Sequence, residues 1–355
     1  MNDAPVKAHG HSLRLDGLDV ARYLALVGMV IVNFKIVMGV DETDGLAATL
    51  TSALEGRAAA LFVVLAGVGL GLAARKGWAG TAIVTLRRAA FLLVVGLANM
   101  LVFDADIIHY YAFYFLFGAA LLSLGSRALV AIILALNIAF VVMVLSLDYE
   151  AGWDFSDFSY EGFWTPVGFV RNLFFNGWHP VIPWLGFLVF GLILSRLDLA
   201  ARPVQGSLIA LGLVTVVAAE GTSAVLIAQF AQDDPVLAEL LTTKPLPPMP
   251  LYSMAGMGCA AVIIGLCLVG AGVLRRSGVV AALAPAGRQT LTLYIAHIFI
   301  GMGALEELGL LGGQSLSAAL MASAAFCALA TVYAYVWSRR FKRGPVEAVM
   351  RRVAG

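Results

Sequence analysis

The sequence predicts an all-α fold, a polytopic transmembrane helical bundle of about ten spans with both termini in the cytoplasm. Hydrophobic residues make up 61% of the 355 residues and charged residues 13%, whereas soluble domains carry about 25% charged residues. Apolar segments of roughly 20 residues, the length that crosses a bilayer, recur from one end of the chain to the other. Basic residues fall in alternate connections between these segments.

The candidate spans are centred near residues 29, 66, 96, 117, 137, 187, 217, 262, 297 and 326. Residues 1–17 are polar and lack the small-residue cleavage pattern of a secretory signal, so we expect the first span to be retained. We therefore expect a cytoplasmic N-terminal tail over residues 1–17 and one transmembrane domain over residues 18–338. A basic cytoplasmic C-terminal tail, residues 339–355, should follow.

The charge distribution predicts the orientation. With the N-terminus inside, nearly all of the 23 basic residues fall on the inner side and most carboxylates on the outer side. This pattern satisfies the positive-inside rule at every connection when the number of spans is even. The long outer loop 147–180 mixes aromatic and acidic residues and should form a partly ordered cap, whereas loop 231–250 is stiffened by prolines.

Motifs of several soluble enzyme classes are missing from the sequence. It has no Walker loop, Rossmann fingerprint, His-Glu-x-x-His or CxxC, which argues against nucleotide hydrolysis and zinc chemistry. Cys259, Cys267 and Cys327 lie in apolar spans without metal-ligand spacing, so we expect no metal site. The net charge of +1 gives no indication of a nucleic-acid partner. The stretch "HSLRLD", residues 11–16, matches the His-x-x-x-x-Asp pattern of soluble glycerolipid acyltransferases, but in a short tail we interpret it as coincidence.

Polar side chains within spans are costly and usually face the bundle interior or a water-filled cavity. Asp19 and Arg22 stand three residues apart in the first span, and Asn33 follows on nearly the same helical face. The first span is therefore expected to carry an inward polar stripe. Further polar candidates within or at the ends of other spans are Asn99, Asn137, Glu220, Lys35 and Arg57.

The five histidines differ in expected depth. Two lie in the N-terminal tail, His109 and His179 lie at the outer mouths of their spans, and His297 lies near the midplane, about 14 Å past Arg288. A buried neutral imidazole suits a general base or a hydrogen-bonding ligand, and the alternative for His297 is an ordinary interhelical hydrogen bond. For His109 and His179 the alternative is a structural place at the membrane interface.

Five segments in order along the chain resemble the YeiB family of bacterial membrane proteins. They also resemble, more distantly, heparan-α-glucosaminide N-acetyltransferase of the transmembrane acyltransferase superfamily. The segments are "RLDGLDVARYLALVGMVIVNF", "GRAAALFVVLAGVGLGL", "NGWHPVIPWLGFLVFGLILSR", "PAGRQTLTLYIAHIFIG" and "RGPVEAVMRRVAG". The resemblance implies a multi-pass protein of the bacterial inner membrane. In the eukaryotic relative an acetyl-CoA donor binds from the cytoplasm and the acyl group reaches an acceptor on the far side.

Within this resemblance, single residues match motif positions of the relative. Asp19, Arg22 and Asn33 match the first-span polar motif of the relative, and Tyr294 with His297 matches its late Tyr-x-x-His segment. The relative's acyl-accepting histidine follows its first-span asparagine, but the corresponding stretch here, "FKIVMGVDETDG", has no histidine. Acyl transfer would therefore be direct or would use one of the other histidines: His109, His179 or His297.

These residues together predict a membrane-embedded acyltransferase-like protein. It would transfer an acyl group, from acyl-CoA as co-substrate and with no tightly bound cofactor, to a cell-envelope sugar, lipid or small-molecule acceptor. We expect His297 as general base, Asn33 as donor to an oxyanion and His179 as a further catalytic residue. Residues expected to bind the substrate are Asp19, Arg22, His109, Arg57, Glu220 and Tyr294. Basic residues expected to attract the CoA phosphates are Arg75, Lys76, Arg87, Arg88, Arg275, Arg276 and Arg288.

Two other functions remain compatible with the sequence. A transporter or permease would use the same intramembrane polar residues as a substrate or proton pathway. A non-catalytic membrane partner subunit would retain the fold without the chemistry. The expected partners are the lipid bilayer and the acceptor molecule, and a homodimer is compatible with the sequence.

Overall fold

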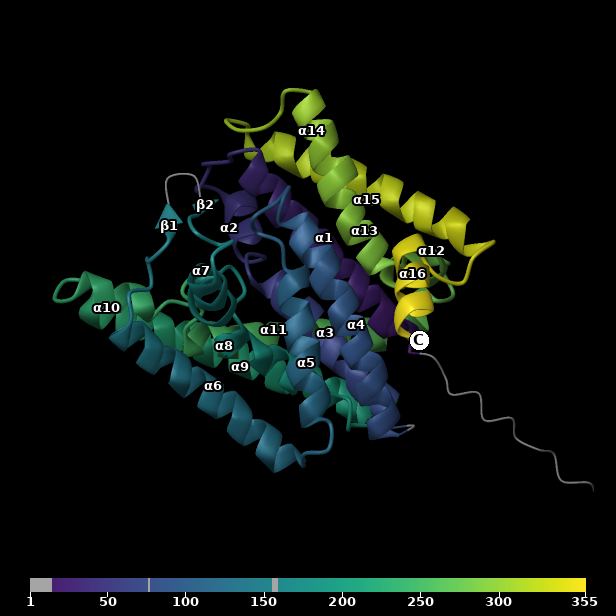
Figure 1. Ribbon diagram of the computed structural model, residues 1–355, viewed down its shortest axis with the longest axis horizontal. Helices are drawn as coiled ribbons and strands as arrows, with labels where there is room; N and C mark the ends of the chain where they lie inside the picture. Colours follow the sequence, from purple (N-terminus) through teal and green to yellow (C-terminus); the bar gives the residue numbers. More distant parts are fainter. Residues whose placement is uncertain (1–14, 76, 155–158) are drawn as a thin grey trace, which may run out of the picture.

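The computed structural model describes residues 15–75, 77–154 and 159–355, which are helical almost throughout (Figure 1). Sequence candidates outside these ranges include His9, His11, Lys76 and most of the "HSLRLD" stretch. Within the described residues, the β-structure is one two-stranded antiparallel hairpin that pairs Trp153 with Tyr160.

The elements follow one another in this order: α1 Asp16–Val37, α2 Leu46–Ser52, α3 Arg57–Ala74, α4 Trp78–Asn99, α5 Ile108–Leu121, α6 Ser126–Ser146, β1 Trp153–Asp154, β2 Ser159–Tyr160, α7 Pro166–Arg171, η1 Asn172–Asn176, α8 Val181–Leu194, α9 Arg202–Phe230, α10 Pro235–Leu240, α11 Pro250–Leu274, α12 Val279–Gly287, α13 Thr290–Ala296, η2 His297–Met302, α14 Gly303–Glu307, α15 Leu316–Ser338 and α16 Pro345–Ala354. The segments η1 and η2 are π-helical.

The helix lengths confirm a multi-pass α-helical membrane protein. Within the described residues, seven helical segments are long and apolar enough to span a bilayer, and an eighth results if the helices on either side of a 50° bend before α8 form one span. The predicted spans near residues 117 and 297 correspond to α5, of 14 residues, and to the segmented α13–η2–α14. The count of ten spans and the placement of the termini stay predictions.

Helix α1 lies at the centre of the packing and contacts α3, α11, α12 and α15 (Figure 1). Its side chains Ala21 and Val30 are fully buried. The long helices α6 and α9 instead expose apolar side chains such as Leu134, Leu145 and Val214, as expected of helices that face lipid. A helix at the centre of the bundle therefore carries the predicted polar residues Asp19, Arg22 and Asn33.

Two glycines bring helices close together next to candidate residues. A Cβ atom at Gly96 of α4 would overlap the backbone nitrogen of His109 on α5, and one at Gly287 of α12 would overlap the carbonyl oxygen of Asp19 on α1. Because glycine lacks a Cβ atom, the backbones approach to contact at both points. These contacts fix the places of His109 and Asp19 in the bundle.

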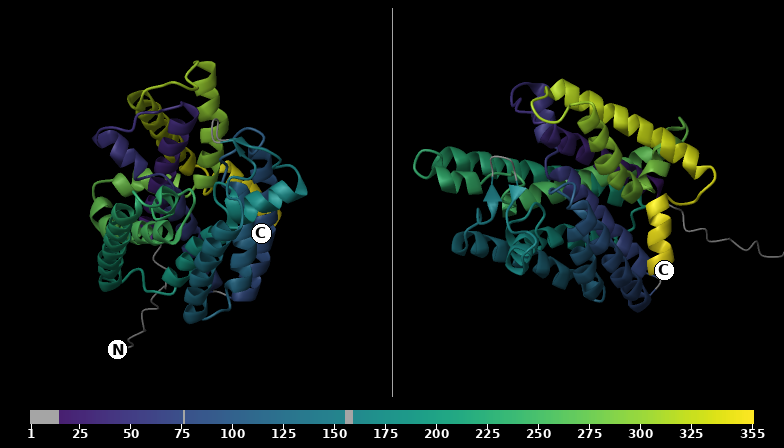
Figure 2. Two further views of the ribbon diagram at one scale, coloured as in Figure 1. Left: turned by 90° about the vertical axis from the view of Figure 1, so that its left-hand side faces the viewer. Right: turned by 45° about the horizontal axis from the view of Figure 1, so that its top comes forward.

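The chain end, expected from the sequence as a basic tail, includes the helix α16. It packs against α4 and across the beginning of α13 (Figure 2). Glu347 of α16 accepts hydrogen bonds from the backbone N–H groups of Leu291 (2.8 Å) and Thr292 (3.1 Å), and from the Thr292 hydroxyl. Helix α13 has no side-chain cap of its own, so α16 supplies the cap for the helix that leads into His297.

The loop predicted as an outer cap is well ordered on both sides of its undescribed residues. The Asn176 amide donates to the carbonyl oxygens of Tyr149 (2.8 Å) and Ala151 (2.9 Å) and accepts from the Tyr160 hydroxyl (2.7 Å). Burial raises the pKa of Tyr160, and a hydrogen bond from Arg171 partly opposes this rise. This network holds the segment that leads into the bend before α8.

Candidate functional site

Asn33 and His297 meet in the interior of the bundle. The Asn33 amide nitrogen lies 2.9 Å from Nε2 of His297, and Nδ1 of His297 hydrogen-bonds to the backbone carbonyl of Tyr294. A carbonyl oxygen only accepts, so Nδ1 carries the proton and Nε2 accepts from the Asn33 amide. Both nitrogens of this neutral imidazole are thus engaged. His297 also opens the π-helical segment η2, a geometry found mostly at functional sites.

A small cavity of about 40 Å³ borders Asn33 of this pair. Its lining side chains include Asn33, Tyr294 and His179, together with Ala105 and Ile107. A volume of this size holds about one water molecule. Three of the sequence-predicted site residues, which come from three distant parts of the chain, therefore share one buried space.

His179 lies in the bend between η1 and α8. Its carbonyl oxygen accepts from the Tyr114 hydroxyl (2.6 Å), and its ring packs edge-on against Trp184, with the ring centroids 4.6 Å apart. The Nδ1 atom is buried and has no hydrogen-bond partner. The sequence predicts His179 at the outer mouth of its span, and the structure shows that the residue lines the small cavity. Its depth in the membrane stays a prediction.

A second buried polar group surrounds Asp106, which precedes α5. The Asp106 carboxylate accepts from the amide of Asn99 (3.2 Å) and the backbone N–H of Ile108 (2.8 Å), and it lies 3.6 Å from Nδ1 of His109. Both Asp106 and His109 are fully buried. The Tyr294 hydroxyl lies beside the same carboxyl group and accepts from the backbone N–H of Ile107 (3.3 Å).

Asp106 was missing from the sequence-predicted site. Hydropathy places it in a short connection, where a carboxylate is expected to face water. The signal that could have found it is its place just before an apolar helix, three residues ahead of a histidine, because aspartate at such a position caps the helix start.

Asp19, Arg22 and Arg288 gather at the other end of α1. The carboxylate of the buried Asp19 lies 2.7 Å from the Arg22 guanidinium and 3.8 Å from that of Arg288. Fourteen helical residues separate Asp19 from Asn33, about 21 Å along the axis. The predicted polar stripe is therefore two separate groups, one at each end of the helix.

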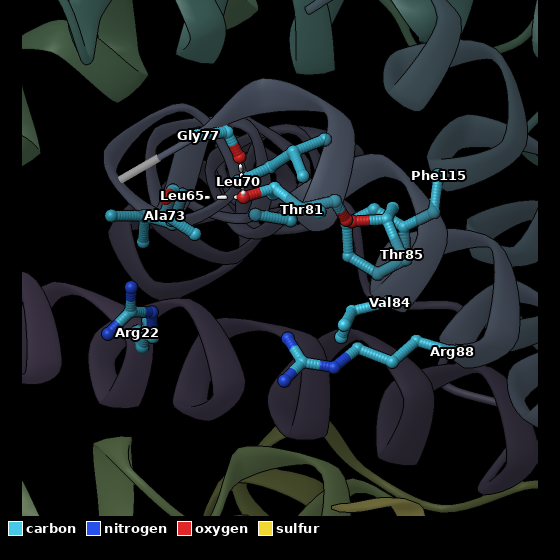
Figure 3. Close-up of a pocket in the computed structure, with 13 residues that line it drawn as sticks. Arg22, Leu65, Leu70, Ala73, Gly77, Thr81, Val84, Thr85, Arg88 and Phe115 are labelled. Carbon is cyan, nitrogen blue, oxygen red and sulfur yellow. Dashed lines mark hydrogen bonds between the residues drawn. The ribbon is translucent and has the colours of Figure 1, made fainter. Parts of the chain in front are cut away.

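A larger cavity of about 550 Å³ lies beside this charged group, between α1, α3 and α4 (Figure 3). Arg22 and Arg88 contribute guanidinium groups, Thr81 and Thr85 contribute hydroxyls, and Phe115 contributes an aromatic side chain. Arg88 also donates to the carbonyl oxygen of Gly355 (3.4 Å). The space combines cationic groups with apolar walls, which suits an anionic ligand that carries an apolar part.

The remaining predicted residues lie elsewhere. Arg57 pairs with Glu220 and donates to the Thr243 hydroxyl (3.2 Å), which donates to Glu220 (2.9 Å). This group ties loop 231–250 to α3 and α9.

Arg75 donates to backbone carbonyls after α8. Of the other basic candidates, Arg275 pairs with Asp16 (2.7 Å) at the surface, and Arg87 and Arg276 are exposed. Among the described residues, no cluster of His, Cys, Asp or Glu side chains could hold a metal ion.

The fold and the buried polar groups define a multi-pass helical membrane protein with a histidine–asparagine centre inside its bundle. Residues 14–232 match the family model described as heparan-alpha-glucosaminide N-acetyltransferase, catalytic, and residues 205–355 match the model described as protein of unknown function (DUF418). The first match covers more than half of the chain. The chain therefore belongs to this acetyltransferase-related family, in its YeiB-like branch. No curated protein matches the chain.

The two matched regions meet in the candidate site. Asn33 and His179 lie in the region of the first model, and Tyr294 and His297 lie in that of the second. The hydrogen bond between Asn33 and His297 joins the two regions. The candidate site is therefore built from both matched regions.

Proposed function

We propose that this protein is a membrane-embedded acyltransferase that passes an acyl group from a CoA thioester to a cell-envelope sugar, lipid or small-molecule acceptor. The observation that supports this most is the convergence of Asn33 and His179 on one buried cavity, in a chain of an acetyltransferase-related family. A nucleophile and an amide donor around one space are the parts that acyl transfer needs.

His179 takes up the acyl group in this proposal. With the proton on Nε2, its unpartnered Nδ1 atom offers a lone pair that attacks the thioester carbonyl. A bond forms between Nδ1 and the acyl carbon, the C–S bond breaks, and the CoA thiolate leaves. The acylimidazolium then reacts with the acceptor. His179 thus replaces the histidine that is missing from the first outer loop.

Asn33 stabilises the oxyanion that forms when the thioester carbonyl is attacked. Its amide has two N–H donors, of which one is directed at His297 and the other is left for the oxyanion. In this account His297 is a positioning residue that orients the amide. This role differs from the general base expected from the sequence, because both ring nitrogens of His297 already have partners.

The acyl donor occupies the larger cavity. Arg22 and Arg88 neutralise its phosphates, and the apolar walls pack against its pantetheine arm. Along α3, Ala66 of the larger cavity and Ala59 of the smaller one are about 10 Å apart, a gap that the pantetheine arm bridges. The smaller cavity holds only a water-sized group, so its walls must separate when the thioester enters. The positive-inside rule puts the larger cavity on the cytoplasmic side of a bacterial inner membrane.

Thiol release from acetyl-CoA tests the proposal. Purified protein in detergent micelles should release about one equivalent of free thiol without an acceptor and continue to turn over when a suitable amino sugar is present. His179→Ala should abolish both phases, and His297→Ala should slow them by about 10²-fold through the misplaced amide.

The exposed residue Ser277 provides the matched control, because Ser277→Ala should behave like the wild type. Unchanged thiol release in His179→Ala would remove this residue from the mechanism. If the wild-type protein releases no thiol from short- or long-chain acyl-CoA but carries a substrate across vesicle membranes, the chain is a transporter and the acyl-transfer proposal is wrong.

A further inference from the structure

His109 occupies an unusual environment. Its side chain is fully buried, and neither ring nitrogen has a hydrogen-bond partner within the described structure. The nearest charged atom is Oδ2 of Asp106, 3.6 Å from Nδ1. Burial of an unsatisfied polar group opposes folding, so this imidazole does not serve the bundle as a structural link. A proton or a hydrogen-bonding group must reach it at some stage.

Asp106 is held rigidly next to this imidazole. The amide of Asn99 and the backbone N–H of Ile108 donate to its two carboxylate oxygens. The residue is as buried as His109, and a buried carboxylate without a matching cation is rare in a membrane bundle. The pair places a carboxylate beside Nδ1 of an imidazole, as in a His–Asp pair, but at 3.6 Å, which is longer than a hydrogen bond.

Tyr294 connects this pair with the cavity. It lines the cavity together with Ala105 and Ile107, the two neighbours of Asp106 along the chain. The oxygen of its hydroxyl accepts from the backbone N–H of Ile107, which leaves the hydroxyl proton free to be donated to the adjacent Asp106 carboxylate. A proton that enters at the cavity wall can therefore pass through Tyr294 to Asp106.

We propose that Tyr294, Asp106 and His109 form a proton relay that removes the proton of the acceptor during the second half of the transfer. This inference rests on the proposed acyltransferase function. As the acceptor oxygen or nitrogen bonds to the acyl carbon, the bond between that carbon and Nδ1 of His179 breaks. The acceptor proton passes to the Tyr294 oxygen, and the Tyr294 proton passes to the Asp106–His109 pair. Neutral His179 is regenerated.

Other titratable side chains lie around the relay, and Tyr111 of α5 interacts electrostatically with Tyr294. Tyr110 stacks on His109 with the ring centroids 3.9 Å apart, and its hydroxyl donates to the Asn172 side chain (2.5 Å). Tyr160 of β2 and His179 before α8 interact electrostatically with Tyr110 and His109, respectively. Phe163 packs edge-on against the His109 ring, with the ring centroids 5.7 Å apart. Asp106 is the carboxylate that lies within 4 Å of the imidazole, so this pair forms the end of the proposed relay.

The relay predicts a specific kinetic defect. Tyr294→Phe, Asp106→Asn and His109→Gln should each form the acyl-His179 intermediate at the wild-type rate but pass it to the acceptor about 10²-fold more slowly. The acylated protein should therefore accumulate in the presence of acceptor. Loss of packing alone would instead slow both half-reactions or reduce the amount of folded protein.

Tyr111→Phe is the matched control. It removes a buried hydroxyl group that has no hydrogen-bond partner. Tyr111 lies on α5, the helix of His109, but is not a member of the relay. Its two half-reactions should equal those of the wild type. Unchanged acyl transfer to the acceptor in both Asp106→Asn and His109→Gln would overturn the relay.

A second measurement separates this inference from the proposed function. In protein labelled with ¹⁵N-histidine, the ring signals of His109 should report a proton on Nδ1 in the wild type and should move in Asp106→Asn but not in Tyr111→Phe. A wild-type protein without thiol release would refute the acyltransferase proposal, and the ¹⁵N signals would still decide whether Asp106 and His109 are coupled. Identical His109 signals in wild type and Asp106→Asn would show that Asp106 and His109 are not coupled, which would overturn the relay.

Discussion

The Asn33 amide contacts His297 and also lines the small cavity. One N–H is directed at Nε2 of His297, and the cavity receives the reacting group in the proposed mechanism. Because the imidazole accepts this hydrogen bond, the position of the amide is fixed before a substrate arrives. Preorganised donors of this kind stabilise a transition state without a cost of reorientation during the reaction.

Asn33→Ala tests this role. We expect thiol release from acetyl-CoA to fall by about 10²–10³-fold, and the free energy of unfolding to fall by about 1–3 kcal/mol because Nε2 of buried His297 loses its donor. Ser323→Ala is the control, since Ser323 is also buried but its hydroxyl donates within its own helix. Equal rates for Asn33→Ala and the wild type would exclude the amide as an oxyanion donor.

The close approach of α4 and α5 at Gly96 can be tested separately. In Gly96→Ala the new methyl group would overlap the backbone of His109, so α4 and α5 must separate and the melting temperature should fall. Gly221→Ala on α9 has open space around the new methyl group, and its stability should be unchanged or rise by up to about 1 kcal/mol through helix propensity. Thermal unfolding in micelles measures both, and equal stability of the two variants would show that no close approach exists at Gly96.

Helix α13 depends on helix α16 for the cap at its N-terminus. Its first backbone N–H groups are capped by Glu347 of α16, 55 residues further along the chain. This cap fixes the beginning of the helical segment that carries Tyr294 and His297. The C-terminal helix therefore takes part in placing the site although it contributes no residue to the cavity.

Glu347→Ala should cost about 1 kcal/mol of stability, the usual cost of a lost helix cap, and should also slow thiol release because the register of His297 loosens. Glu347→Gln keeps an oxygen that accepts hydrogen bonds and should recover part of the loss. Glu307→Ala, at an exposed acidic residue, is the control. A stable and fully active Glu347→Ala variant would mean that α13 holds its place without α16.

The sequence predicts the helices far better than it predicts their junctions. Apolar length alone locates α1, α6, α9 and α11, because the bilayer requires that length of any span. The glycine and prolines of "NGWHPVIPW" indicate a break before α8 but not the angle of its bend. The π-helical turn at His297 leaves no comparable signal, because it arises from tertiary packing. Asp106 is hidden for the same reason, because its burial depends on the contact of α4 with α5. Hydrophobic periodicity could identify Asn33 and His297 as polar residues within spans, but it could not predict that the two side chains contact each other.

At the scale of the whole molecule, the two family regions are complementary parts of one bundle. The first supplies Asn33, Asp106 and His179, and the second supplies Tyr294, His297 and the capping helix α16. The larger cavity and the smaller one lie at different depths along α1 and α3. In the proposed function, this arrangement separates the charged cavity that binds the acyl donor from the buried cavity in which the acyl group is transferred.

The predicted orientation can be tested with single cysteines in a variant whose three natural cysteines, Cys259, Cys267 and Cys327, are replaced by alanine. Ser277→Cys should react with a membrane-impermeant maleimide only from the cytoplasmic side, and Ser315→Cys only from the opposite side. Both serines are exposed. Labelling of both positions from one side would contradict the predicted topology and the cytoplasmic place of the donor cavity.

The most direct test of the central claim is the intact mass of the protein after brief exposure to acetyl-CoA without an acceptor, followed by peptide mapping. The account predicts a mass increase of one acetyl group, located on His179, in the wild type and in Asp106→Asn, and none in His179→Ala. An acetyl group on any other residue, or an unmodified protein that still transfers acetyl groups to an acceptor, would contradict it.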